Sequence, residues 1–456
     1  MRTLLIVLML TLSLPLLSQK TFREADLIAV VKKYHPVAKQ AYLDVRISNA
    51  NITSSRGEFD PLARFENSRK DFDGINYYNQ QWSELRIPTW YGVDFYAGTE
   101  TVKGDRTNPE ETKGRLNYIG VSLPLVQNLV IDKRRAIVQQ AKVFREQSEV
   151  VRRAVINDLL SDALIAYWNW WERHQLLLVA RTARANAKER LEMVKTIYNL
   201  GDRAAIDTLD AEAQVQLFEQ QEAEATMQLQ KSRLQLSTFL WREKDVGYEL
   251  PEDAVPEQPR RENGLGVDSL LSEAKVHPLI LEFQFKLSAL AIEKKLRFQS
   301  LLPQIEAKYN QLGRQFSRTL SNNLFENNYR FGVSMSMPLR LSEARGEYRI
   351  AKLKIEQARL SQIAKTVEVQ NKVKQYYIEW QQTGTQVDLQ QKLVVNYLAL
   401  QKGEETRFLN VESSLFLINA RELRTIEGKQ KLTELSAKNQ LAIVMLKWSA
   451  GFFGNM

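Results

Sequence analysis

Apolar and polar residues alternate along several short segments of the chain. From Tyr329 to Met337 the odd positions hold large apolar side chains, whereas the even positions hold Arg, Gly and Ser. Residues 91–97 and 119–123 show a similar pattern. A period of two places successive side chains on opposite faces of a strand. These segments therefore predict β-strands with one apolar face and one more polar face.

A second pattern predicts unusually long helices. Residues 125–200 contain neither glycine nor proline, and about 76 residues at 1.5 Å per residue form a rod of roughly 110 Å. Gly201 then predicts a break, and a second helix from about Ala204 to Trp241 completes an antiparallel hairpin. Apolar residues recur every three or four positions, as in the seam of a coiled coil, at Ala180, Ala183, Ala187, Leu191, Val194 and Tyr198.

An internal repeat makes this order of elements occur twice. Two prolines lie 25 residues apart in each copy, namely Pro36 and Pro61 in the first copy and Pro278 and Pro303 in the second. Histidine precedes the first proline of each pair, and helix termination explains His35 and His277 better than metal binding does. The second copy also predicts a helical hairpin, with helices at about 342–409 and 414–448 and possible soft points at Gly384 and Gly403.

These patterns divide the chain into a leader, two repeats and a linker. The predicted segments are a signal peptide at 1–19, a first repeat at 20–242, a linker at 243–266 and a second repeat at 267–456. The strand regions are 61–125 and 303–339, and the hairpin tips lie near 201 and 411. The first strand region is about 28 residues longer, which leaves two alternatives, a long extracellular loop at 103–115 or an added strand hairpin.

The leader predicts export from the cytoplasm. Arg2 precedes an apolar run from Leu4 to Leu17, and Ser18 and Gln19 follow before charged residues begin, as in a secretory signal peptide. No later stretch approaches the ~20 consecutive apolar residues of a transmembrane helix. Any membrane crossing by this chain should therefore be made by strands.

Composition argues against an enzyme and against a nucleic-acid-binding protein. The formal charge is +9, but acidic and basic residues are interspersed along the predicted helices, which is typical of solvated faces. The chain has no cysteine and only three histidines, so disulfides and thiolate metal sites are excluded. No catalytic motif stands out. We therefore expect no catalytic residues, no cofactor and no metal.

The predicted strands are too few to close a sheet within one chain. An open sheet edge in lipid leaves backbone groups unpaired, at a cost of roughly several kcal/mol each. The edges should therefore be closed by other copies of the chain.

The export signal, duplicated His-Pro helices, strand hairpins and long helical hairpins together resemble the TolC family of outer-membrane efflux proteins. The resemblance covers essentially the whole mature chain. It implies a mainly α fold, in which long antiparallel coiled-coil hairpins form a periplasmic tunnel and three chains share a transmembrane β-barrel of about four strands per chain. It also implies an exit duct for efflux or type I secretion, located in the outer membrane with a large periplasmic part. Outer-membrane lipid, a periplasmic adaptor protein and an inner-membrane pump would be its partners.

The sharpest local match is the segment from Tyr198 to Gln214, which resembles the periplasmic-tip motif of that family. Asp207 and Asp210 lie three residues apart on one helix face, and in a trimer they would form rings of negative charge at the pore aperture. The resemblance assigns Gly201, Asp202 and Arg203 to the tip and to adaptor contact.

Two alternatives remain open at this point. Asp207 and Asp210 are also ordinary residues for a helix N-terminus, where the helix dipole favours acids. Their counterparts in the second repeat, 210 residues later, are Leu417 and Ala420, so only one hairpin per chain could supply the ring. The alternative function is a secreted or periplasmic coiled-coil scaffold without a pore, which explains the helices but not the alternating strands.

Overall fold

The computed structural model describes residues 21–201, 204–262, 264, 266–321, 324–410 and 412–455. The predicted signal peptide and the tip position near 411 lie outside the described residues. The chain divides into two compact units. Unit 1 comprises Met1–Ala41, Arg153–His277 and Glu368–Met456, and unit 2 comprises Tyr42–Arg152 and Pro278–Val367.

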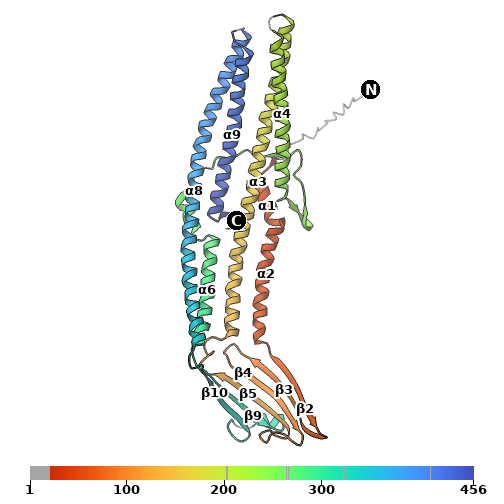
Figure 1. The fold of residues 1–456 in the computed structure, drawn as a ribbon, viewed down its shortest axis with the longest axis vertical. Helices are drawn as coiled ribbons and strands as arrows, with labels where there is room; N and C mark the ends of the chain where they lie inside the picture. The colour runs from red at the N-terminus through yellow and green to blue at the C-terminus, as the bar shows by residue number, and fades with distance from the viewer. Residues whose placement is uncertain are drawn as a thin grey trace, which may run out of the picture. The chain divides into compact units, whose positions relative to one another are not determined.

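A six-stranded antiparallel sheet dominates unit 2 (Figure 1). Its strands are β2 (Leu62–Phe72), β3 (Ile75–Pro88), β4 (Asp94–Lys103), β5 (Gly114–Pro124), β9 (Gln304–Gly313) and β10 (Tyr329–Ser336). The spatial order is β10-β9-β5-β4-β3-β2, so the strands of the second repeat extend the sheet begun by the first. The sheet ends at β2 on one side and β10 on the other, and each has one strand neighbour among the described residues.

The strand count corrects the expectation of about four strands per chain. The described sheet has six, because residues 62–88 form the hairpin β2–β3 in addition to the two hairpins of the resemblance. The turn-rich stretch at 103–115 is the loop between β4 and β5. The longer first strand region therefore contains an added pair of strands, and this decides between the two alternatives for the extra residues.

The register of the strands gives the sheet two chemically different faces. Residues that pair directly across antiparallel strands share a face. One face, which we call the apolar face, carries Leu85, Ile87, Phe95, Ala97, Ile119, Val121, Tyr309, Phe331, Val333 and Met335. The other, the polar face, carries Arg64, Glu84, Arg86, Asp94, Tyr118, Ser122, Glu306, Lys308, Arg330 and Ser334. The alternation in the sequence thus becomes a separation of chemistry across one sheet.

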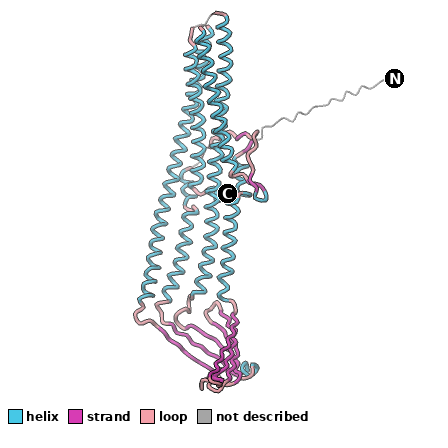
Figure 2. The backbone as a smooth tube through the Cα atoms, turned by 45° about the vertical axis from the view of Figure 1, so that its right-hand side comes forward, coloured by secondary structure: helices cyan, strands magenta, loops and turns pink. Residues whose placement is uncertain are grey.

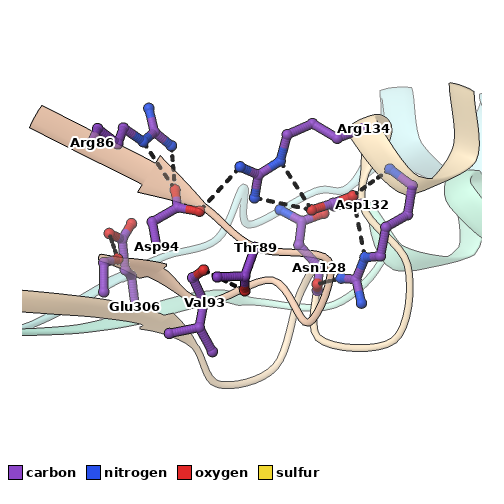
Figure 3. A network of polar contacts seen from close by, with 10 residues as sticks. Arg86, Thr89, Val93, Asp94, Asn128, Asp132, Arg134 and Glu306 are labelled. Atoms are coloured by element: carbon purple, nitrogen blue, oxygen red, sulfur yellow. Dashed lines mark hydrogen bonds and ion pairs between the residues drawn. The ribbon is translucent and has the colours of Figure 1, made fainter. Parts of the chain in front are cut away.

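Polar contacts in unit 2 connect the sheet to the start of the long helix α3 (Lys133–Asn199) (Figure 3). Asp94 on β4 accepts hydrogen bonds from Arg86 Nε at 3.1 Å and from Arg134 Nη1 at 3.0 Å. Asp132 caps the helix, because its Oδ1 accepts from the backbone N–H of Arg135 at 2.8 Å. The beginning of α3 is therefore fixed to β4 by charged hydrogen bonds.

Two shorter helices follow the duplicated His-Pro pairs. α2 (Pro36–Arg56) and α6 (Pro278–Gln299) each begin at the proline, where a missing backbone N–H costs nothing. α1 (Glu24–Tyr34) ends at His35, and α5 (Val267–Ala274) ends shortly before His277. The interpretation of both histidines as helix-boundary residues agrees with these bounds.

Unit 1 is built on two antiparallel helical hairpins, which Figure 2 shows as paired helical tubes. The first pairs α3 with α4 (Ala205–Ser237), and the second pairs α8 (Ser342–Leu409) with α9 (Leu415–Ser449). α8 is one continuous helix, so Gly384 and Gly403 do not interrupt it. Short elements complete the fold, namely β1 (Thr21–Phe22), β6 (Trp241–Arg242), β7 (Val246–Gly247), β8 (Val255–Pro256), α7 (Phe316–Ser321) and three 3-10 turns.

The core of unit 1 contains the aromatic cluster of α3. Trp168, Trp170 and Trp171 are at most 4% exposed and pack among leucines of α1, α3 and α4. They are therefore packing residues of the core. The predicted seam is buried at Ala180, Ala183, Ala187 and Val194, but Tyr198 is 44% exposed because it lies in the last turn of α3, beyond the buried cluster. Among the described helices, none combines the length and apolarity needed to cross a bilayer.

Candidate functional site

The first hairpin reverses direction at Gly201, directly after the end of α3. Its backbone has φ +85°, which side chains beyond glycine rarely adopt, and its N–H donates to the carbonyl of Tyr198 at 2.9 Å. Nothing lies within 4 Å of the position that a Cβ would occupy. Backbone conformation, not crowding, therefore explains the glycine. The predicted tip residues Asp202 and Arg203 lie outside the described residues.

The two predicted aperture aspartates lie in the first turns of α4. Asp207 is half-buried and Asp210 is exposed. Asp210 Oδ2 accepts a hydrogen bond from Asn419 Nδ2 of α9 at 3.2 Å. The structure thus brings Asp210 into contact with the second hairpin of the same chain.

A buried ion pair lies behind this contact. Arg190 of α3 donates from Nη1 to Asn419 Oδ1 at 3.0 Å and to Glu422 Oε2 at 2.6 Å. The side chains of Arg190 and Glu422 are only 8% and 2% exposed. Asp210, Asn419, Arg190 and Glu422 therefore form one continuous polar chain across α4, α9 and α3. In a site with little water, such charge-assisted bonds are shorter and stronger than neutral ones.

Apolar side chains surround this polar chain. One buried cluster joins all four long helices and consists of Val194, Ala211, Phe408, Leu415 and Ile418. A second cluster, further from the turns, contains Phe218 and Ile426. The two hairpins are therefore packed together on both sides of the Arg190–Glu422 pair.

The second hairpin tip has a different chemistry. Leu417 and Ala420, the counterparts of the two aspartates, are both exposed. Glu404 is buried and accepts from Ser413 Oγ at 2.6 Å, with Arg421 Nε 3.8 Å away. Glu404 is therefore turned into the chain, whereas Glu412 in the turn is exposed.

Large apolar side chains are exposed near both turns. In the first hairpin these are Leu200, Ile206 and Leu209, and in the second they are Leu409 and Phe416, with exposed fractions of 66–75%. Isolated apolar residues on a surface are normal, but groups of them at one end mark interaction surfaces. This exposed apolar surface was not predicted from the sequence, although all five residues lie close to the predicted turns.

The buried ion pair was also missed, although the sequence contained a signal for it. Arg190 lies three residues after Ala187 and four before Val194, and both are buried seam residues. A charge inside an apolar seam needs a partner. The counterparts of the pair in the other repeat, Leu400 and Glu212, are exposed, so the repeat alone does not reveal it.

Titration in the first hairpin is altered where its helices are buried. Burial lowers the pKa of His174, and the positive charge of Arg181 adds to the effect. Burial raises the pKa of Glu172, two residues earlier. Within the described ranges, His, Asp and Glu side chains form no group of three that could hold a metal ion.

Part of the chain matches a known protein family. Residues 92–240 match the model of the family described as outer membrane efflux protein. No curated protein matches the chain.

Solved structures with the same fold include three from bacterial pathogens. The MtrE outer membrane channel of Neisseria gonorrhoeae, in its open state, is 15% identical with a TM-score of 0.67, and the match covers 94% of this chain and 89% of that one. VceC, an outer membrane protein of Vibrio cholerae, is 11% identical with a TM-score of 0.67, covering 94% and 96%. The CmeC outer membrane channel of Campylobacter jejuni is 14% identical with a TM-score of 0.65, covering 94% and 86%.

Residues 92–240 therefore resemble outer membrane efflux proteins in sequence, and the chain has the fold of solved outer membrane channels. This agrees with the class that the sequence resemblance implied.

Proposed function

We propose that three copies of the chain form a passive exit duct, which receives its cargo from an inner-membrane pump through a periplasmic adaptor protein. In this proposal the sheets close one wall across the outer membrane, and the helical hairpins continue the duct on the periplasmic side. The observation that carries it is the sheet of unit 2, which has two chemically distinct faces and two open edges.

The open edges favour closure by sister chains. β10 is exposed along its whole length, and β2 is exposed at all but one position. Six alternating strands make β10 antiparallel to β2, so the edge of one copy matches the opposite edge of the next. Closure satisfies backbone groups that would otherwise cost roughly several kcal/mol each in lipid. Three copies of six strands give 3 × 6 = 18 strands in the closed wall.

The two faces favour an aqueous interior. The apolar face displays Val333 and Met335 with exposed fractions of 56% and 67%, as a lipid-facing surface requires. The polar face carries a hydrogen-bonded set in which Trp82 Nε1 donates to Tyr118 Oη at 2.7 Å and Tyr118 donates to Glu84 at 2.8 Å. Such a face is suited to line a water-filled passage.

We also propose that Asp207 and Asp210 of three chains form the aperture and favour cations. Gly201, Asp202 and Arg203 would contact the adaptor, and the exposed apolar residues Leu200 and Ile206 would extend that contact. Interfaces typically bury such apolar groups at their centre, with polar residues at the rim.

Engineered disulfides would test the closure directly, because the natural chain has no cysteine. Cysteines at Ala63, Phe65 or Asn67 of β2 would be combined with cysteines at Phe331, Val333 or Met335 of β10, which covers the plausible registers on one face. Oxidation in membranes should give covalent products that end at three chains on a denaturing gel, since a disulfide forms only when the Cβ atoms approach to roughly 3.5–4.5 Å.

The matched control replaces Arg64, which lies on the polar face of β2, and combines it with the same β10 positions. That set should stay largely monomeric, because its sulfurs point to opposite sides of the wall. A ladder that ends at two chains, or no ladder in any register, would refute the trimeric closure.

A further inference from the structure

The short helix α7 lies on the apolar face of the sheet, in the loop between β9 and β10. A Cβ on Gly313 would come within 2.2 Å of Thr319 Oγ1, so α7 packs directly over the end of β9. Asn117 of β5, which pairs with Gly313 and shares its face, donates from Nδ2 to the carbonyl of Arg314 at 3.0 Å. These contacts fix the helix on the side of the sheet that carries the apolar side chains.

A hollow of about 520 Å³ lies beside this helix. Its walls include Phe65, Leu85, Ala97, Arg115 and Phe316. The volume falls within the roughly 300–1,000 Å³ typical of small-ligand pockets. The hollow therefore combines an apolar floor from β2, β3 and β4 with a guanidinium from β5.

The hollow lies where the apolar face becomes polar. The pairs Leu85–Ala97 and Ala97–Ile119 form an apolar row, and the row two residues further along contains Ser83, Thr99 and Asn117. In the next row the paired residues are Thr101 and Arg115. On the lipid-facing side of a membrane wall, such a change from apolar to polar marks the level of the lipid headgroups.

The charge at this level is positive. Arg115 and Arg314 are exposed, and neither forms an ion pair with any described residue. Arg115 Nε donates to Thr99 Oγ1 at 3.2 Å, which holds the stem of the side chain over the hollow. α7 also exposes Phe316 and Leu320, with 47% and 67% of their surfaces accessible. An apolar surface beside unpaired arginines complements an amphipathic anion, because the acyl chain of the anion can contact the apolar surface while its phosphate contacts an arginine.

We propose that this hollow binds one anionic, phosphate-bearing membrane lipid, with an acyl chain against Phe65, Leu85 and Ala97 and the phosphate at Arg115. The inference rests on the proposed placement of the apolar face against lipid. Guanidinium and phosphate form charge-assisted hydrogen bonds that are stronger than neutral ones.

The test titrates the full-length, delipidated protein in detergent with phosphatidylglycerol and counts bound lipids by native mass spectrometry. The natural chain should bind phosphatidylglycerol about tenfold or more tightly than zwitterionic phosphatidylcholine. Arg115→Gln should weaken phosphatidylglycerol binding by about tenfold or more, because it removes a hydrogen bond to a charged group. Ala97→Phe should weaken both lipids, because its ring fills the hollow without changing a charge.

The matched control is Lys308→Gln, which removes one positive charge from the polar face of the same sheet and should leave binding unchanged. Equal binding by the natural chain and Arg115→Gln would overturn the proposal, as would equal weakening by Lys308→Gln. Displacement of the lipid by inorganic phosphate at equal concentration would assign the site to free phosphate and overturn the lipid.

Channel currents in planar bilayers separate this inference from the proposed function. Normal currents together with unaltered lipid binding in Arg115→Gln would refute only the lipid site. A chain that stays monomeric in water without detergent would refute the membrane placement itself.

Discussion

The two helical hairpins of unit 1 share their architecture but differ at their turns. Ala204 and Ser414, which lie 210 residues apart in the repeat, precede α4 and α9. Ser414 Oγ accepts from the backbone N–H of Leu417 and caps α9, whereas Ala204 offers no side-chain cap. The first tip also presents Asp207 and Asp210 near its turn, whereas the second buries Glu404 and exposes a single acid, Glu412, in the turn.

This difference shows how duplication separates packing from function. The long helices keep similar lengths, 67 and 68 residues in α3 and α8 and 33 and 35 residues in α4 and α9, because both hairpins must bury an apolar stripe. The residues at the turns contribute little to that packing and can diverge. We infer that the second hairpin mainly supports the first, which carries the charged and less firmly capped tip.

The largest expected effect comes from breaking the support between the hairpins. Arg190→Ala leaves Glu422 as an unpaired buried charge and should lower the free energy of unfolding by about 3–5 kcal/mol. Urea titration of the detergent-solubilised protein would measure it. The control is Lys188→Ala, on the same helix as Arg190, which removes an exposed ion pair to Glu219 of α4 and should cost only about 0–1 kcal/mol. Similar losses in both variants would mean that burial of the pair is unimportant.

Exchanging the caps should alter the two hairpins in opposite directions. Ser414→Ala should lower the free energy of unfolding by about 1 kcal/mol, and Ala204→Ser should raise it by up to a similar amount, because serine can satisfy a free N–H of the first turn. Hydrogen exchange at α4 and α9 would locate the changes. If Ser414→Ala left exchange in α9 unaltered, the proposed difference in capping would be wrong.

Removing the acids of the first tip should change conduction more than stability. Asp207→Ala combined with Asp210→Ala should raise single-channel conductance by roughly twofold, because smaller side chains leave a wider aperture. The same change should weaken block by multivalent cations, because rings of carboxylates attract these cations and hold them in the aperture. Planar bilayer recordings provide the measurement. Glu412→Ala, an exposed acid of the second tip, is the control and should leave currents unchanged. Equal effects of both changes would contradict an aperture formed by the first hairpin alone.

The smallest effect concerns acid sensitivity of the first hairpin. Because the pKa of His174 is lowered in the folded state, the unfolded chain binds the proton more readily below about pH 6.5, and stability present above that pH is lost as the pH falls. His174→Gln should therefore reduce the fall in thermal midpoint between pH 7 and 5.5 by roughly 1–2 °C.

The raised pKa of Glu172 acts in the opposite sense. Its contribution is greatest below the ordinary value of 4.5 and fades as the pH rises, so it cannot cause a loss of stability on acidification. The counterparts in the second hairpin, Gln382 and Gly384, do not titrate. An unchanged pH profile in His174→Gln would remove the histidine as the cause.

Much of the fold could be predicted from periodicity. A period of two identified the strands near Tyr329 and Ile119, and the absence of glycine and proline identified α3, whose observed start at Lys133 is eight residues later than the glycine-free stretch begins. The added hairpin β2–β3 could not be assigned, because strands such as Leu62–Phe72 carry charged residues on an edge and show little alternation.

The candidate site could be predicted only where it is local in sequence. The turn at Gly201 and the spacing of Asp207 and Asp210 are properties of one short segment. The bond from Asn419 to Asp210 joins residues 209 positions apart, and its existence depends on how the hairpins pack. The position of Arg190 in the apolar seam indicates burial, but its partner Glu422 lies 232 positions away and could not be identified from the sequence.

The extra hairpin β2–β3 at the edge of the sheet would increase the diameter of a closed wall. The diameter of a closed sheet grows roughly linearly with the number of its strands. A wall with six strands per copy is half again as long in circumference as one with four. In the proposed duct, the mouth formed by the sheets would therefore admit bulkier solutes, and selection by size would depend on the aperture proposed at Asp207 and Asp210.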